Sequence, residues 1–236
     1  MVVNEFVSGS IAVVIAYLLG AVPAAYIITR IFSGKDIRQV GGGNVGARNV
    51  FQEVGWAAGV ATGVFDIGKG AAAVFIAIKI LGVPAWWFAD VPAEWLSSVP
   101  TYFVLASALA VVVGHIWPIY LRFRGGNGLS PAIGVLAILM TRELLLAFAL
   151  TIVILFFVRN PILSVNISLL TVPLTGWYME KSWLLVGFTI VLLLVMVLHF
   201  VPTARAALKK AGSWDNLVDE LLRREKPKKV KQKVVK

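Results

Sequence analysis

Two residue types that build most metal and disulfide sites are scarce in this chain of 236 residues. Cysteine is absent, which excludes disulfide bonds and thiolate ligands, and the only two histidines are His115 and His199. We therefore expect no metal site and no cofactor. Charged residues make up only 14% of the chain, well below the quarter or so that is typical of soluble domains. This composition disfavours a soluble protein.

The usual motifs of nucleophilic and nucleotide-binding enzymes are also missing. The sequence has no Gly-x-Ser-x-Gly elbow, no Ser-x-x-Lys pair and no P-loop. The spacing Gly41-x-Gly43-x-x-Gly46 matches the dinucleotide fingerprint, but that motif must follow a strand, and apolar helical segments flank it here. The chain is therefore not expected to bind a dinucleotide, and it lacks these nucleophile templates.

Long apolar runs are abundant instead. Hydrophobic residues make up 59% of the chain, and a spanning helix needs about 20 of them in succession. Runs at 8–30, 54–82, 101–121, 161–178 and 182–202 are long enough, while 128–141 and 143–158 are shorter. We predict an all-α integral membrane protein with a seven-transmembrane helix bundle. Five spans is the alternative, with the two shorter runs forming a re-entrant pair. The first run, which lacks a basic flank, is expected to stay as a transmembrane helix.

Basic residues indicate the orientation of this bundle. The net charge is +10, and its distribution fits membrane topology better than nucleic-acid binding. With seven spans, one face carries Lys35, Arg38, Arg48, Arg122, Arg124 and Arg159. We therefore expect the N-terminus outside and the C-terminus in the cytoplasm, in the cell inner (cytoplasmic) membrane. Residues 1–205 would form the transmembrane domain. Residues 206–236 would form a basic cytoplasmic tail that either contacts anionic lipid or stays solvated.

Two glycine-rich loops follow apolar runs on the predicted cytoplasmic face. Glycine lets backbone N–H groups converge on an anion, and arginine and asparagine add directed donors. We predict that the loops bind phosphate, with a plain flexible turn as the alternative. The candidate residues are Gly41, Gly42, Gly43, Asn44, Gly46, Arg48, Asn49, Arg124, Gly125, Gly126, Asn127 and Gly128.

Four ionisable side chains lie within or at the ends of apolar runs. Asp66 and Lys69 are three residues apart and share one helical face. They would form either a structural ion pair or part of a functional site. His115 is expected to form a structural hydrogen bond. His199 is the best candidate for a general base, with a role at the helix end as the alternative. Gly55, Gly59 and Gly63 form a small-residue stripe that favours close helix packing.

The order of these motifs resembles one known family. The stretch Asp36-Ile37-Arg38-x-x-Gly41-Gly42-Gly43-Asn44-x-Gly46-Ala47-Arg48-Asn49 is followed by Asp66-x-x-Lys69-Gly70 and then by Gly114-His115-x-x-Pro118 and Phe123-Arg124-Gly125-Gly126-Asn127-Gly128. This order is similar to that of the PlsY family, over nearly all of residues 15–205. These are bacterial membrane enzymes that transfer a fatty acyl group from acyl phosphate to glycerol 3-phosphate, giving lysophosphatidic acid.

The resemblance implies roles for individual residues. The two loops would hold the phosphates of donor and acceptor, together with Arg205, and His199 would orient or deprotonate the acceptor hydroxyl. Asp36, Arg38, Asp66, Lys69 and His115 would support the site. No metal and no acyl-enzyme would be needed, and membrane lipids would surround the acyl chain.

Five positions depart from the family pattern. Gly42, Arg48, Gln52, Asn127 and Pro202 stand where the family has serine, threonine, arginine, lysine and asparagine. The leading hypothesis is an acyltransferase that is a divergent member of the family. The alternative is a catalytically altered or inactive paralogue that binds a phospholipid or another phosphorylated metabolite. A transporter is the weakest option, because the halves show no inverted repeat.

Overall fold

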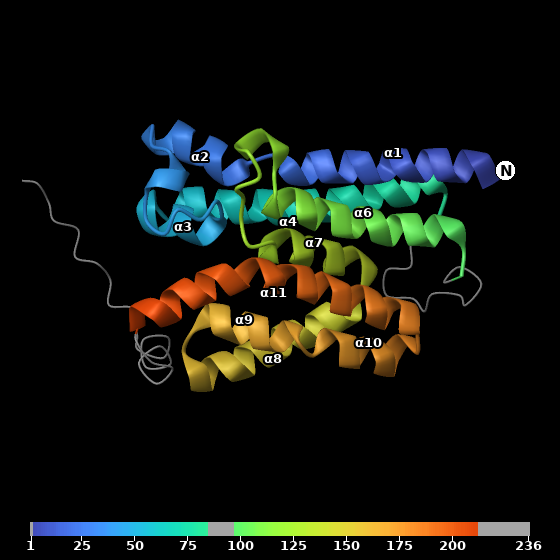
Figure 1. Cartoon of the computed structure of the whole chain (residues 1–236). Coiled ribbons are helices and arrows are strands. Elements are labelled where there is room, and N and C mark those ends of the chain that lie inside the picture. The colour runs from blue at the N-terminus through green and yellow to red at the C-terminus, as the bar shows by residue number, and fades with distance from the viewer. Residues whose placement is uncertain (1, 85–96, 212–236) are drawn as a thin grey trace, which may run out of the picture.

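All regular elements of the described chain are helical, as the sequence predicts. The computed structural model describes residues 2–84 and 97–211, and Figure 1 shows their arrangement. The helices are α1 (Val2–Ala21), α2 (Ala24–Ser33), η1 (Ile37–Gln39), α3 (Ala47–Glu53), α4 (Trp56–Leu81), α6 (Val99–Ile116), η2 (Ile119–Leu121), α7 (Leu129–Leu139), α8 (Thr141–Val158), α9 (Pro161–Leu169), α10 (Val172–Glu180) and α11 (Trp183–Ala211). Most of the expected basic tail, residues 212–236, lies outside the described residues.

Several helices are long and apolar enough to cross a membrane. Among the described residues four segments meet this description, namely Asn4–Ser33, Val99–Leu121, Thr141–Val158 and Trp183–Pro202. The chain is therefore a multi-pass membrane protein. The count of seven spans and the direction of the termini stay predictions.

Two of the apolar runs are interrupted where proline occurs. The first breaks between α1 and α2, because Pro23 has no N–H to donate and disfavours the helical conformation of Val22. The run 161–178, expected as one helix, forms α9 and α10 instead, and Pro173 lies in the first turn of α10. The periodicity of an apolar run therefore predicts helix but not its continuity.

Glycines bring pairs of long helices into backbone contact. A β-carbon at Gly20 of α1 would collide with the carbonyl oxygen of Val111, and one at Gly114 of α6 with the carbonyl oxygen of Tyr17. The crossing of α4 and α7 is built in the same reciprocal way. There Gly70 faces the carbonyl oxygen of Pro131, and Gly134 faces that of Ile67. Such close approach is how membrane helices gain packing without a hydrophobic driving force.

The predicted stripe of Gly55, Gly59 and Gly63 has a packing role at Gly59 and Gly63, whereas Gly55 precedes α4 and a β-carbon there would have nothing within 4 Å. A β-carbon at Gly59 would collide with the backbone of Phe51, and one at Gly63 would touch the side chain of Ala47 at 3.6 Å. Both contacts come from α3. The stripe therefore seats the short helix that follows the first glycine loop.

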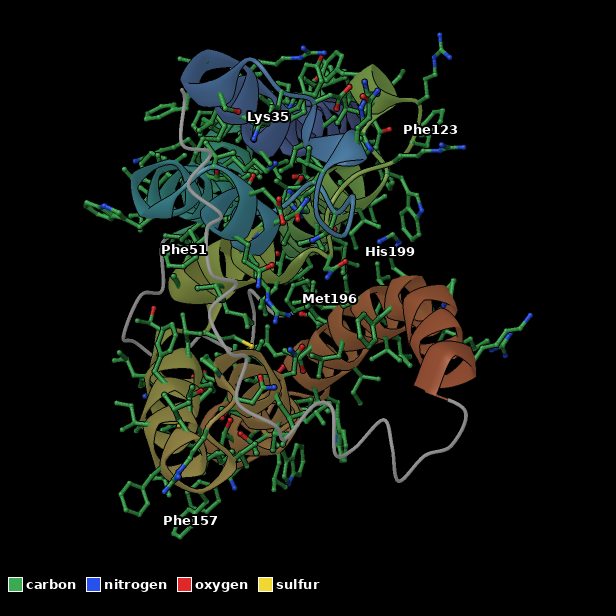
Figure 2. The ribbon with its side chains drawn as sticks, turned by 90° about the vertical axis from the view of Figure 1, so that its left-hand side faces the viewer. Lys35, Phe51, Phe123, Phe157, Met196 and His199 are labelled. Carbon is green, nitrogen blue, oxygen red and sulfur yellow. The ribbon has the colours of Figure 1, made fainter. Side chains whose placement is uncertain are left out.

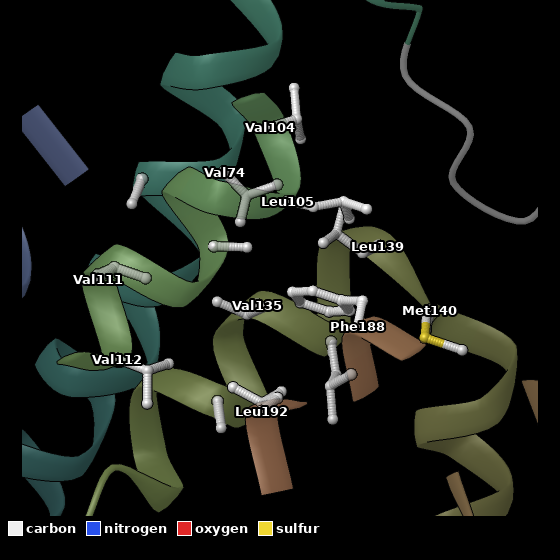
Figure 3. Packing of buried hydrophobic residues seen from close by; sticks show 14 of the residues in the cluster. Val74, Val104, Leu105, Val111, Val112, Val135, Leu139, Met140, Phe188 and Leu192 are labelled. Atoms are coloured by element: carbon white, nitrogen blue, oxygen red, sulfur yellow. The ribbon is translucent and has the colours of Figure 1, made fainter. Parts of the chain in front are cut away.

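Two apolar clusters hold the bundle together. The larger one joins α1, α4, α6 and α7 to α11, where Phe188 and Leu192 face Val135 and Leu139 (Figure 3). The smaller one lies beneath the loops. Its buried members are Ala25, Ile37, Val45, Val50, Ala58 and Leu121. This second cluster fixes the first loop, α3 and the turn after α6 against one another.

Both glycine loops lie at one end of the bundle. Figure 1 shows α2, α3 and the connection after α6 away from the labelled N-terminus, with the C-terminal part of α11 on the same side. Predicted binding elements that are far apart in the sequence are therefore brought to one end of the molecule.

Candidate functional site

A buried ionic cluster lies below the loops. Lys69 Nζ is 2.8 Å from Asp66 Oδ1, and His115 Nδ1 is 3.5 Å from the same oxygen. The side chains of Asp66 and Lys69 are each only 2% exposed. Charges at such depth are stable in a membrane only when they are paired. The predicted ion pair is thus present, and it includes the histidine of α6 as a third member.

The cluster also reaches the break in the first apolar run. Lys69 Nζ donates a hydrogen bond of 3.0 Å to the carbonyl oxygen of Val22. Interrupted helices leave carbonyls without an intrahelical donor, and in lipid such groups need a protein partner. A small cavity beside the cluster is lined by the α1–α2 junction, by α4 and α6, and by Val45 and Gly125 of the two loops.

The first glycine loop is organised by one amide side chain. Asn49 Nδ2 donates to the carbonyl oxygens of Ile37, Val40 and Asn44 at 3.3, 3.1 and 3.0 Å. Its Oδ1 accepts from the N–H of Gly42 at 3.2 Å. Asn49 was expected to bind phosphate, but its polar atoms are engaged within the loop. Its position at the start of α3 therefore sets the loop's shape.

Asp36 and Arg38 brace the entrance to this loop. Arg38 Nε lies 3.0 Å from Asp36 Oδ1 and its terminal nitrogen 2.7 Å from Oδ2, a two-pronged ion pair. The guanidinium also stacks on the ring of Tyr26, 5.1 Å from its centre. Hydrogen bonding to Arg38 lowers the pKa of Asp36 to about 2, despite an opposing effect of burial. This pair therefore fixes the start of the first loop, and its support of a binding site stays a prediction.

The second glycine loop folds back onto the end of α6. The N–H groups of Gly125 and Gly126 donate to the carbonyl oxygens of Ile116 and His115, each at 3.1 Å. A β-carbon at Gly126 would collide with His115 Nε2 and would lie 2.7 Å from the carbonyl oxygen of Val45. The two glycine loops therefore meet at Gly126, directly against the buried cluster.

The available N–H donors differ from those expected. The N–H groups of Gly42, Gly43, Gly125 and Gly126 donate to acceptors within the protein, so these four N–H groups do not point at an anion. Each loop instead ends in a helix whose N-cap is a glycine without a side-chain cap, Gly46 for α3 and Gly128 for α7. The first N–H groups of a helix have no intrahelical partner, and its dipole favours anions there.

His199 approaches the loops through an aromatic contact. Its ring meets that of Trp117 edge to face, with ring centres 5.6 Å apart and an angle of 89°. Figure 2 shows His199 on the side of α11 that faces the rest of the bundle. Arg205, six residues further along α11, is exposed. The sequence reasoning missed Trp117, although it stands two residues after His115 in the same motif.

Trp117 is itself held in place from α1. The hydroxyl of Tyr17 donates to the carbonyl oxygen of Trp117 at 2.9 Å. The end of α6 is thus fixed to the first helix just before the second glycine loop begins. No pattern in the sequence identifies this contact, since the two residues are 100 positions apart. No group of three or more histidine, aspartate or glutamate side chains that could hold a metal occurs in the described part of the chain.

Known proteins share this sequence and fold. The family model described as glycerol-3-phosphate acyltransferase matches residues 10–209. The "Glycerol-3-phosphate acyltransferase 1" of Dehalococcoides mccartyi is 36% identical over 212 residues, covering 88% of this chain and 94% of that protein. The "Glycerol-3-phosphate acyltransferase" of Thermosynechococcus vestitus is 36% identical over 182 residues, covering 75% and 81%.

A solved structure agrees with these relatives. The crystal structure of PlsY (YgiH), an integral membrane glycerol 3-phosphate acyltransferase in its glycerol 3-phosphate form, superposes with a TM-score of 0.71. The sequence identity is 26%, and the alignment covers 86% of this chain and 93% of that one.

Proposed function

This chain belongs to the glycerol-3-phosphate acyltransferase family that includes PlsY, and we propose that it transfers a fatty acyl group from acyl phosphate to glycerol 3-phosphate. Its membership indicates an acyltransferase of phospholipid synthesis in a membrane. The proposal adds the acyl-phosphate donor and the lysophosphatidic acid product. The convergence of both glycine loops at Gly126 is the observation that carries it.

The reaction needs little covalent chemistry from the protein. The hydroxyl oxygen of glycerol 3-phosphate forms an ester bond to the acyl carbon, and the bond from that carbon to the phosphate oxygen breaks. Inorganic phosphate leaves with the electron pair, and the imidazole of His199 takes up the hydroxyl proton. Two phosphorylated substrates must be held side by side, and orientation of this kind lowers the barrier most.

The loops offer two neighbouring places for these phosphates. We assign one to Asn44 and Arg48 of the first loop, and the other to the start of α7 with Arg124 and Asn127. A helix N-terminus favours an anion, and arginine adds directed, charge-assisted donors. Arg205 would contribute from α11.

The departures from the family pattern do not disturb this arrangement. All five stand on exposed residues, namely Gly42, Arg48, Gln52, Asn127 and Pro202. The residues that shape the loops are retained, including Asn49 and Gly126. No observation therefore favours the inactive paralogue over an active enzyme.

The location is proposed together with the activity. The end of the bundle that carries the glycine loops is basic, since Arg30, Lys35 and Arg38 precede the first loop in the chain and Arg122 precedes the second. By the positive-inside rule this end would face the cytoplasm. We propose the cytoplasmic membrane, with seven crossings and the N-terminus outside.

The proposal is tested by assaying the full chain purified into lipid. Acyl phosphates of several chain lengths and glycerol 3-phosphate are supplied, and lysophosphatidic acid is measured by mass spectrometry. We expect product from the wild type and at least a hundredfold less from His199→Ala. Lack of product at every chain length, with a folded protein, would rule the proposal out. Stabilisation by glycerol 3-phosphate without turnover would support the inactive paralogue instead.

A further inference from the structure

The turn between α6 and the second glycine loop, residues 119–123, has no part in the proposed reaction. Its main chain is closed by hydrogen bonds, since Leu121 N and Phe123 N both donate to the carbonyl oxygen of Pro118, at 3.1 and 2.9 Å. Arg122 N donates to the carbonyl oxygen of Ile119 at 3.3 Å. The turn is therefore a fixed shape and not a loose connection.

Its backbone is held in an unfavourable conformation. Arg122 and Phe123 have φ angles of 53° and 60°, and the left-handed region costs about 1–2 kcal/mol per residue that has a side chain. Arg159 and Lys181 share this feature as the C-caps of α8 and α10, and Arg122 is likewise the C-cap of η2. Phe123 caps no helix. Strain of this kind persists where the conformation presents a side chain for use.

The turn presents apolar side chains outward. Leu121 is 5% exposed and belongs to the small core, whereas Ile119, Tyr120 and Phe123 are 50, 56 and 58% exposed. Figure 2 shows Phe123 pointing away from the bundle. Leu121 thus anchors the turn, and its neighbouring apolar side chains are exposed on the surface of the protein.

A cation stands among these apolar groups. Arg122 is exposed, and within the described chain no carboxylate forms an ion pair with it. The nearest charged residue along the chain is Arg124, which is also positive. The guanidinium of Arg122 is therefore available to bind an anion from outside the protein.

The turn lies on the flank of the bundle. Figure 1 shows it beside the junction of α1 and α2, on the opposite side from α8 and α10. The flank of a membrane protein faces lipid, and this end carries the glycine loops. Aromatic rings and arginine together are typical of the layer where lipid headgroups meet the acyl chains.

We propose that residues 119–123 form a binding site for an anionic phospholipid of the surrounding bilayer. Arg122 contacts the headgroup phosphate, and Ile119, Tyr120 and Phe123 lie at the boundary of the acyl chains. A soluble acidic partner fits less well, because without lipid the three large apolar side chains would be exposed to water. The location rests on the proposed function, but lipid binding does not depend on acyl transfer.

A lipid bound at this site would also affect the rate of acyl transfer. The turn leads directly into Gly125 and Gly126, whose hydrogen bonds hold the second loop to the end of α6. A bound headgroup offsets the strain at Arg122 and Phe123, and so steadies the start of that loop. Anionic lipid should therefore increase the rate of acyl transfer.

Native mass spectrometry of the full chain in detergent tests binding directly. The protein is titrated with phosphatidylglycerol or with phosphatidylcholine. We expect tighter binding of phosphatidylglycerol, weakened about fivefold by Arg122→Gln, since one basic residue near a membrane is worth about 1 kcal/mol. Lys35→Gln removes an exposed charge at the same end and should change affinity less than twofold. The basic tail is common to all variants, so its contribution cancels.

A second pair of variants tests the apolar part. Phe123→Ser should weaken phosphatidylglycerol binding, whereas Phe157→Ser, which removes an exposed ring of α8 (Figure 2), should not. Equal affinity for both lipids, or equal loss in Arg122→Gln and Lys35→Gln, would overturn the proposal. Displacement of the lipid by inorganic phosphate would overturn it too, because it would identify a site for free phosphate. Preferential binding of a polyglutamate peptide would do the same.

Acyl transfer in nanodiscs provides the functional readout. Wild type should be faster in phosphatidylglycerol than in phosphatidylcholine, and Arg122→Gln should lose this difference while keeping turnover in phosphatidylcholine. A lipid preference that Arg122→Gln retains would contradict the proposed link to activity. If no variant shows acyl transfer, the binding measurements still decide the lipid site, and the failure belongs to the proposed function alone.

Discussion

Lys69 of α4 is hydrogen-bonded to the carbonyl oxygen of Val22, at the break between α1 and α2. It is also 2.8 Å from the carboxylate of Asp66. One buried amine thus satisfies an interrupted helix and a buried charge. Through His115, which packs against Gly126, the same cluster touches the second glycine loop.

Lys69→Met should therefore be strongly destabilising. It leaves the buried carboxylate of Asp66 with only the imidazole of His115 beside it, and loss of one partner of a buried pair costs about 3–5 kcal/mol. The measurement is thermal unfolding in detergent. Lys79→Met on the same helix removes an exposed amine that stacks on Phe75, and it should cost far less. Equal losses in the two variants would show that the buried cluster adds no stability.

Two glycines of α4 should respond oppositely to alanine. A β-carbon at Gly70 would collide with the backbone of Pro131 in α7, whereas one at Gly68 would have nothing within 4 Å. We expect Gly70→Ala to lower the melting temperature and Gly68→Ala to raise or keep it, since alanine favours helix by up to about 1 kcal/mol. A melting temperature for Gly70→Ala at or above that of wild type would contradict the tight α4–α7 crossing.

Gly126→Ala should impair activity more than stability. The added methyl group would push His115 Nε2 and the carbonyl oxygen of Val45 away, and so separate the two loops. Misplacement by about 1 Å can cost a hundredfold in rate. Gly42→Ala is the control, because its β-carbon meets open space. The assay is acyl transfer at saturating substrate, and unchanged turnover in Gly126→Ala would count against the shared junction.

The stability contributed by Asp36 should depend on pH. Its pKa is about 2 in the folded protein, below the ordinary 3.8. A lowered carboxyl pKa gives stability that is present above the unfolded value and is lost as the pH falls through the folded one. The difference in melting temperature between wild type and Asp36→Asn should therefore be constant above pH 5 and shrink between pH 4 and pH 2. A constant difference down to pH 2 would contradict this account.

Asn127→Lys should strengthen phosphate binding. Position 127 is exposed beside the start of α7, so lysine adds a charge without repacking. A hydrogen bond to a charged group is worth about 1.5–3 kcal/mol, which corresponds to roughly one to two decades in KM for glycerol 3-phosphate. Steady-state kinetics at fixed acyl phosphate measures it. An unchanged KM would place this side chain outside the phosphate site.

Local patterns in the sequence predicted much of this arrangement. The apolar runs indicated helices, the glycine stripe of α4 indicated close packing, and the charge pattern placed both loops at one end. The pair Asp66 and Lys69 could be expected because two opposite charges at that spacing share a helix face. These features depend on residues that are near one another in the chain.

The remaining features depend on contacts between distant segments. His115 of α6 faces Asp66 of α4 through the packing of two helices that are distant in the sequence, and no spacing encodes that. The inward hydrogen bonds of Gly125 and Gly126 depend on where α6 ends. For this reason the sequence located the glycine loops but misjudged which N–H groups are available.

The shared support of the two loops bears on how the protein responds to heat. Gly126 of the second loop packs against both His115 and the carbonyl oxygen of Val45 in the first loop, so neither loop can lose its order without releasing the other from its neighbour. Local unfolding proceeds in cooperative units of this kind. On warming, the site should therefore be lost in a single step that involves both loops, and partial disorder of one loop should not be observed in an otherwise active protein.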